Sequence, residues 1–177
     1  MTYNSNPNHQ RISIDMEKKK IKKFIYEGLG FPVVLMNVTL VKKREVWTPA
    51  IDYNKLQKEV LLALSHKPIS LTGNEIHFIR AYFAMTLENF GQEFGVTHAA
   101  VLNWEKTRNK SAKINPTTEL YIRLFILDKL NINNQAFRDM FREFDIQSIA
   151  KEQKNPKPTE KPLILPGSAA KRPILRA

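Results

Sequence analysis

Residues 85–110 read MTLENFGQEFGVTHAAVLNWEKTRNK, and two short amphipathic segments meet in this stretch at Gly95. Thr86 and Thr97 each precede a segment and can cap a helix, because a threonine hydroxyl accepts a hydrogen bond from an N–H group that the first helical turn leaves unpaired. Gly95 suits the left-handed backbone that ends a helix. The stretch therefore predicts two short helices joined by a tight turn, which is the helix-turn-helix arrangement.

The second helix of this pair is predicted to bury one side and to expose the other. Its apolar residues Val101, Leu102 and Trp104 are expected to hold it against neighbouring helices. The exposed residues of its opening turns are then His98, Ala99, Ala100 and Asn103. Basic residues follow at Lys106, Arg108, Lys110 and Lys113. Because two of the exposed residues are small, this helix can lie close against another surface.

Further helices are predicted around the pair, and together they form a domain at residues 71–145. Thr72 can cap the helix before the pair, and Asn115 followed by Pro116 can start the helix after it. A last helix is predicted at residues 135–144, with one apolar side formed by Phe137, Met140, Phe141 and Phe144. Core packing is the default interpretation of this apolar side. Because the surface is larger than a small bundle needs, a homodimer face is the second interpretation.

The N-terminal half is predicted to hold a small ββα module at residues 24–67. Residues 33–41 alternate in polarity, which predicts a half-buried strand whose inner face is Val34, Met36, Val38 and Leu40. A charged turn and a returning strand at residues 46–48 follow, and Asp52 can cap a helix that covers the hairpin. The flanks are read as a basic flexible leader at residues 1–23 and a basic, proline-rich, disordered tail at residues 146–177.

The composition argues against several chemistries. The chain has no cysteine, and its four histidines lie far apart in the sequence, so neither a metal site nor another cofactor is expected. No apolar run is long enough to span a membrane, and a cytoplasmic, nucleoid-associated protein is the simple interpretation. Neither a carboxylate pair nor a nucleophile with its base nor a glycine-rich phosphate loop is apparent, so an enzyme is not expected.

The formal net charge of +11 indicates a polyanionic partner. This charge is unevenly distributed, because residues 71–130 carry seven basic and six acidic side chains, a balance of only +1. Most of the excess lies in the flanks. The helix-turn-helix region is therefore predicted to choose a binding site, and the flanking lysines to add affinity without choosing it.

Residues 86–105 resemble the XRE/Cro-type helix-turn-helix family of transcriptional regulators. The likeness rests on the Thr86 cap, the Phe90-Gly91 pair, the Phe94-Gly95-Val96 turn, the capped second helix and the Trp104-Glu105 pair. In that family the later helix lies in the major groove of DNA. The resemblance implies that the DNA-binding residues are Thr86, Thr97, His98, Ala99, Ala100, Asn103, Lys106, Arg108 and Lys110.

The same resemblance implies a structural ion pair between Arg80 and Glu105, and it places Trp104 in the core. Two positions depart from the family pattern. Leu87 stands where the family usually has a polar residue, and Thr107 stands where glycine commonly ends the helix. The expected fold is mainly α with a small α+β N-terminal module, that is, a five-helix XRE/Cro-like bundle preceded by a β-hairpin and a helix.

The order of modules is also similar to that of MqsA/HigA-like antitoxins of type II toxin–antitoxin systems. MqsA-type proteins carry a zinc-binding N-terminal module, which a chain without cysteine would have to build without metal. The likeness implies a homodimeric repressor that binds a palindromic operator in double-stranded DNA and autoregulates its promoter. A protein toxin would bind to the N-terminal module or to the C-terminal tail.

A second hypothesis comes from the charge in the flanks. In this reading the chain is a protein-interaction or nucleic-acid-compaction adaptor, and its basic arms bind DNA or RNA without regard to sequence. The helices would then serve only as a scaffold.

Overall fold

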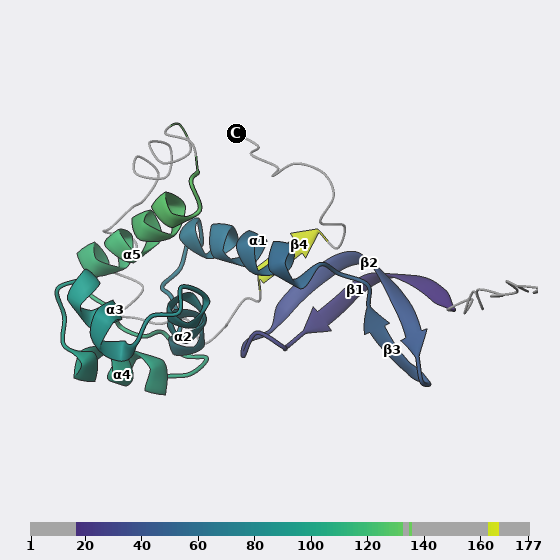
Figure 1. Cartoon of the computed structure of the whole chain (residues 1–177), viewed down its shortest axis with the longest axis horizontal. Coiled ribbons are helices and arrows are strands. Elements are labelled where there is room, and N and C mark those ends of the chain that lie inside the picture. The colour runs from purple at the N-terminus through teal and green to yellow at the C-terminus, as the bar shows by residue number, and fades with distance from the viewer. Residues whose placement is uncertain (1–16, 133–134, 136–162, 167–177) are drawn as a thin grey trace, which may run out of the picture.

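The computed structural model of the chain describes residues 17–132, 135 and 163–166. These residues form five helices and a four-stranded mixed sheet, which lies to one side of the helices (Figure 1). The prediction of a mainly α fold with only a small β-containing module is therefore wrong, because two long strands, of nine and eleven residues, build a substantial sheet. None of the helices in these ranges is both long and apolar enough to cross a membrane.

The helices begin where the sequence predicts them. They are α1 (Tyr53–Ser65), α2 (Gly73–Tyr82), α3 (Leu87–Glu93), α4 (His98–Lys106) and α5 (Pro116–Lys129). Each is preceded by a cap whose side chain accepts a hydrogen bond from the first turn, and these caps are Asp52, Thr72, Thr86, Thr97 and Asn115. All five predicted caps are confirmed. The helix predicted at residues 135–144 lies outside the described residues, except for Gln135.

The sheet is organised around the longest strand, β2 (Val33–Lys43). One edge of β2 pairs with the antiparallel β1 (Lys18–Tyr26) along most of its length. The other edge is shared, because the antiparallel β3 (Val46–Pro49) pairs with its C-terminal part and the parallel β4 (Leu163–Pro166) pairs with its N-terminal part. The predicted strands at residues 33–41 and 46–48 are confirmed within this larger arrangement.

Two of the four strands come from the segments that the sequence assigned to the flanks. Residues 18–23, read as part of a flexible leader, form most of β1. Residues 163–166, read as part of a disordered tail, form β4. In both cases β2 provides the backbone partners, so the pairing depends on a distant strand and not on the local composition.

The predicted inner face of β2 is only half right. Val38 and Leu40 belong to the main core, but Val33 and Leu35 join them in place of Val34 and Met36. The physical reason is Asn37, whose backbone is left-handed with φ of 56°. This conformation interrupts the simple alternation of an extended strand, so the core-facing residues change from odd to even positions along the strand.

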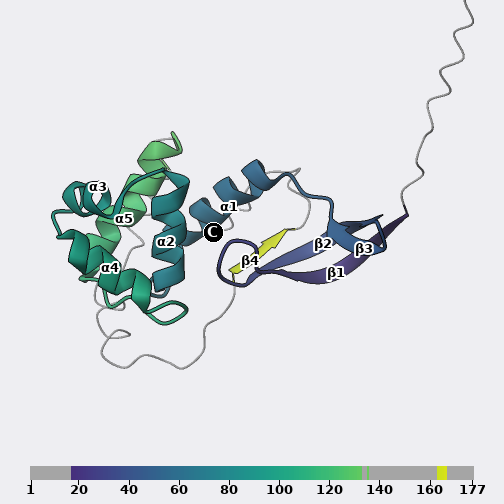
Figure 2. The same cartoon turned by 60° about the horizontal axis from the view of Figure 1, so that its bottom comes forward.

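One core joins the sheet to the helices. Buried residues of β2 and β4, such as Leu35 and Leu165, belong to the same cluster as Leu61 of α1, Ile79 of α2 and Ile126 of α5. The helix α1, expected to cover a hairpin, contacts α5, β4 and α2. It therefore lies between the sheet and the other helices (Figures 1 and 2).

The connection between α1 and α2 is held by buried charges. The Arg123 side chain of α5 is fully buried and donates hydrogen bonds to the carbonyls of Leu64 at 3.1 Å, Lys67 at 2.5 Å and Ile69 at 2.8 Å. It also donates to the buried Glu119 carboxylate at 2.6 Å. The sequence places a boundary between two units at this connection, yet the structure ties it firmly to α5.

A second buried ion pair lies beside the first. Lys67, in the connection, donates to both carboxylate oxygens of Glu75 at 2.8 Å. Glu75 in turn accepts from the backbone N–H of Thr72 and so completes the capping box of α2. Helix α2 is thereby anchored to the same connection as α5.

We expect Arg123→Met to lower the free energy of unfolding by about 3–5 kcal/mol, because it leaves the Glu119 carboxylate buried without its partner. Chemical denaturation by urea measures this loss. The double variant Arg123→Met/Glu119→Gln should lose less, since no lone charge then remains buried. A loss from the single variant no larger than that of the double would contradict the role given to the ion pair.

The pairing of β4 is tested by two neighbouring residues that differ in burial. Leu165 is 7% exposed and Ile164 is 68% exposed. We expect Leu165→Ala to lower the free energy of unfolding by about 2–3 kcal/mol, whereas Ile164→Ala should change it by less than about 1 kcal/mol. Equal effects of the two substitutions in urea denaturation would show that β4 does not dock in this register.

Candidate nucleic-acid interface

The turn between α3 and α4 depends on two glycines. Gly91 has no room for a side chain, because an added Cβ would lie 2.6 Å from the carbonyl oxygen of Val96. Gly95 has a left-handed backbone with φ of 68°, as predicted. The backbone N–H of Val96 donates to the carbonyl of Gly91 at 2.8 Å and closes the turn. Two short helices are thus held at a fixed angle, with α4 at the surface.

Helix α4 buries one side and exposes the other. Val101 is fully buried and Trp104 packs against the core, as predicted. Leu102 was expected to pack with them, but 38% of it is exposed. A helix turns by about 100° per residue, and Val101 already occupies the inward direction. The exposed side of α4 consists of His98, Ala99, Leu102, Asn103 and Lys106.

The structure brings most of the predicted DNA-binding residues to this one surface. His98, Ala99, Asn103 and Lys106 are exposed on α4, and Ala100 is half-buried beside them. Thr97 is exposed at the start of α4, where its hydroxyl accepts from the N–H of Ala100 at 3.2 Å. Thr86 caps α3 in the same manner. Arg108 and Lys110 are exposed in the loop that follows α4.

The loop after α4 is held by the first turn of α2, which sequence reasoning missed. The backbone N–H of Asn74 donates to the carbonyl of Arg108 at 2.8 Å, and its side chain donates to Asn109 at 2.6 Å. The same side-chain amide donates to the carbonyl of Gly30, in the turn between β1 and β2, at 2.7 Å. The sequence alone could not indicate this role, because an asparagine is common in the first turn of a helix and does not reveal which loop it contacts.

The backbone also explains the departure at Thr107. This residue is the C-cap of α4, and the left-handed position that glycine would take is filled by Arg108, with φ of 54°. The hydroxyl of Thr107 donates within the loop, to the carbonyls of Trp104 and Lys110. At the position where the family pattern has a glycine without a side chain, this chain therefore has the basic side chain of Arg108.

The departure at Leu87 has a different explanation. Leu87 is partly buried and packs against the main core. An apolar side chain at the start of α3 therefore contributes to packing in place of a polar contact with a ligand.

The ion pair predicted between Arg80 and Glu105 is confirmed. Two nitrogens of Arg80 donate to the two carboxylate oxygens of Glu105, at 2.6 and 3.1 Å. His77 adds a third contact to this carboxylate at 3.0 Å, which the sequence analysis did not foresee. The only acidic side chain of α4 is therefore turned toward α2, and it does not lie on the exposed side of the helix.

The surroundings of Glu105 shift its acidity. Burial alone would favour the neutral form, but hydrogen bonds from Arg80 and His77 outweigh it and hold the pKa of Glu105 below its usual value. No group of three or more histidine, aspartate or glutamate side chains in the described ranges is placed to hold a metal ion. The surface around α4 thus offers hydrogen-bond donors, small side chains and positive charge.

The lowered pKa of Glu105 makes part of the stability depend on pH. A carboxyl with a lower pKa in the folded state contributes stability above its unfolded pKa, about 4.3, and loses it as the pH falls through the folded pKa. We expect Glu105→Gln to cost about 1–2 kcal/mol at neutral pH. In urea denaturation this difference from the wild type should shrink as the pH is lowered, and a difference that stays constant would exclude the ionised pair.

Comparisons with known proteins identify no relative of this chain. No family model, curated protein or solved structure matches the chain.

Proposed function

We propose that the chain is a sequence-specific DNA-binding protein that inserts α4 into the major groove. The observation that carries the proposal is the outer side of α4, where small and polar side chains are exposed and the acidic Glu105 is turned inward to Arg80. A helix inserted into a groove lined by phosphates needs such a surface, because an exposed carboxylate would be repelled.

The exposed side chains suit the edges of base pairs. Asn103 can form two hydrogen bonds with adenine, and the methyl group of Ala99 can contact the methyl group of thymine. Leu102, exposed between them in sequence, adds a second apolar group for the same kind of contact. These three residues follow the spacing of one helical side, so they can reach neighbouring base pairs together.

Phosphate contacts would come from the ends of α4. The N-terminal turn of α4 presents backbone N–H groups and the Thr97 hydroxyl, a combination that favours an anion. Arg108 and Lys110 lie in the loop that Asn74 holds, so their backbone is fixed before DNA arrives. These contacts would orient the helix without reading the sequence.

A regulatory role follows from this mode of binding. Helix-turn-helix proteins that bind as dimers place two reading helices about 34 Å apart, one turn of DNA, and so recognise palindromes. We propose that this chain acts in that way as a homodimeric repressor. Its narrower form, an antitoxin that binds a toxin and represses its own promoter, is supported by the sequence resemblance.

The reading role of α4 is tested at Asn103. We expect Asn103→Ala to weaken binding by about 1–3 kcal/mol on the sequence that the wild-type protein selects from a random duplex pool, and to leave binding to an unrelated duplex unchanged. Fluorescence anisotropy with labelled duplexes measures both affinities. Asn54→Ala, at an exposed position on α1, is the matched control and should behave as the wild type.

The same measurement separates the proposal from the adaptor hypothesis. If Asn103→Ala weakens binding to every duplex equally, α4 does not read bases. If the wild-type protein selects no sequence from the pool, the chain binds nucleic acid through charge alone and the sequence-specific function is refuted.

A further inference from the structure

The strongest positive charge among the described residues lies on the sheet. Residues 17–49, here called the basic ribbon, carry eight basic and three acidic side chains, a balance of +5. Residues 71–113, which contain the helix-turn-helix, carry five basic and four acidic side chains, a balance of +1. Glu88 and Glu93 are exposed on α3, so they offset part of the positive charge that Lys106, Arg108 and Lys110 supply around α4.

The acidic residues of the ribbon form salt bridges with only one of its lysines. Lys42 forms salt bridges with Glu17 at 3.6 Å and Glu45 at 2.8 Å. The remaining cations of the ribbon make no salt bridge with a described residue, and their side chains are exposed; they are Lys18, Lys19, Lys20, Lys22, Lys23, Lys43 and Arg44. The third acid, Glu27, lies beyond the opposite end of β1.

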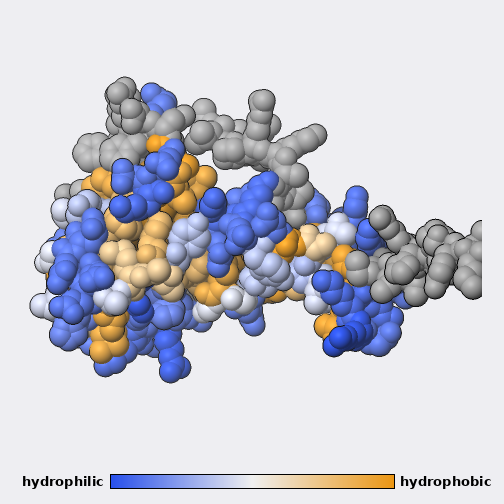
Figure 3. All heavy atoms as spheres, in the orientation of Figure 1, coloured by the Kyte–Doolittle hydropathy of each residue, from blue (hydrophilic) through white to orange (hydrophobic). Residues whose placement is uncertain are grey.

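The pairing register gathers several of these cations at one end. Lys18 is opposite Val41 and Lys20 is opposite Thr39, while Val46 is opposite Lys43. Leu40 belongs to the core, so the neighbouring positions 39 and 41 face away from it, together with their partners. Lys18, Lys20 and Lys43 therefore share the outer face of the sheet near the β2–β3 turn. Figure 3 shows hydrophilic residues gathered at this end of the molecule.

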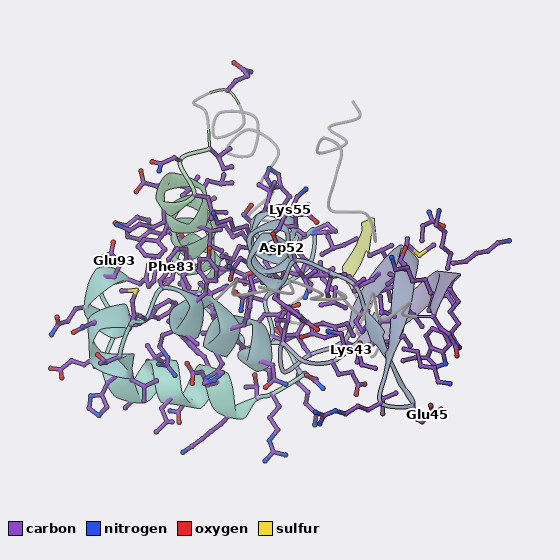
Figure 4. All side chains as sticks on the ribbon, turned by 45° about the vertical axis from the view of Figure 1, so that its right-hand side comes forward. Lys43, Glu45, Asp52, Lys55, Phe83 and Glu93 are labelled. Carbon is purple, nitrogen blue, oxygen red and sulfur yellow. The ribbon has the colours of Figure 1, made fainter. Side chains whose placement is uncertain are left out.

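The ribbon end and α4 lie on the same side of the molecule. Both reach the lower edge in Figure 1, and they remain level with each other in Figure 2, where that edge comes forward. Figure 4 shows Lys43 and Glu45 at this lower side, and Lys55 of α1 on the opposite one. A straight rod laid along this side would meet both α4 and the ribbon end.

The length of the ribbon matches the repeat of DNA. Strand β2 has eleven residues, which span about 36 Å at roughly 3.3 Å per residue. One turn of B-DNA is about 34 Å long, so the same face of the backbone returns at nearly this interval. The base of the ribbon meets the loop after α4 through Asn74, so the ribbon end lies about one DNA turn beyond that loop.

We propose that the outer face of the ribbon end, formed by Lys18, Lys20 and Lys43, binds the phosphate backbone of the duplex that α4 reads, one helical turn or more from the bases that α4 contacts. The inference rests on the proposed function for the position of α4. It assigns to the sheet a separate task, which is to supply affinity from the flank of the site without regard to sequence.

The test compares two double variants that remove the same number of charges. Lys20→Gln/Lys43→Gln alters the ribbon end. Lys55→Gln/Lys58→Gln removes two exposed lysines of α1, of which Lys55 lies on the opposite side in Figure 4 and Lys58 follows three positions later on the same helix. Affinities are measured by fluorescence anisotropy over a range of salt concentrations. The probes are the selected sequence with about 20 base pairs, two helical turns, on either side, the same sequence trimmed of these flanks, and an unrelated duplex of full length.

We expect the wild-type protein and the α1 variant to bind the long duplex several-fold more tightly than the trimmed one. The ribbon variant should bind both equally, and the slope of log affinity against log salt on the long duplex should fall in magnitude by about 2. Its preference for the selected sequence over the unrelated duplex should persist, because α4 is intact. Circular dichroism and urea denaturation verify that the variants are folded.

Several results would overturn the inference, and they differ from those that refute the proposed function. If the ribbon and α1 variants show the same affinities and slopes, the lysines of β1 serve only to protect an edge strand from pairing with other chains. Vesicles containing phosphatidylserine serve as a fourth probe. If the ribbon variant binds every duplex as the wild type does and loses binding only to these vesicles, the surface recognises a membrane. Loss of sequence preference in Asn103→Ala concerns α4 and leaves the comparison of long and trimmed duplexes valid.

Discussion

The guanidinium of Arg123 is the interaction on which the relation between the two halves of the molecule depends. It is fully buried in α5, and its donors end in the carbonyls of the connection between α1 and α2 and in the Glu119 carboxylate. Burial raises the pKa of Glu119 in spite of this cation, because the site is withdrawn from water. Moving the connection would leave Arg123 paired with Glu119 on the same helix but would remove its bonds to the buried carbonyls of Leu64, Lys67 and Ile69, at a cost of about 1–3 kcal/mol for each buried group left unpaired.

This constraint would allow α4 and the basic ribbon, the two proposed DNA contacts, to act on the same duplex. Helix α1 shares a hydrophobic core with the sheet and also contacts α5. Holding the C-terminal end of α1 in place therefore also holds the sheet in place. Asn74 adds a second tie between the β1–β2 turn and the loop after α4. The distance between α4 and the basic ribbon is thereby kept nearly constant. Two contacts at constant spacing suit a rigid, periodic partner such as duplex DNA.

The features predictable from the sequence are those whose cause is local. A helix cap and the glycines of a tight turn depend on residues close in the chain, and both are found. The Arg80–Glu105 pair joins residues 25 positions apart, and it was expected only because the sequence resembles a family that has such a pair. Strands β1 and β4 could not be recognised in this way, because a run of lysines and a proline-bounded island acquire their conformation from β2. Leu102 was expected in the core but is exposed, and Arg123, of a residue type usually found at the surface, is fully buried without any local pattern that indicates it.

The divided edge of β2 has a consequence during synthesis. Val34 and its partner Ile164 differ by 130 positions (164 minus 34). At roughly 5–20 residues per second, translation needs roughly 7–26 s to supply β4 after β2 has been made. During this interval the N–H and C=O groups of residues 33–36 on that side have no strand beside them, and the adjoining apolar side chains are without Leu165. The nascent chain therefore passes through a period in which another polypeptide, such as a chaperone or a neighbouring copy, can pair with β2 before its own strand arrives.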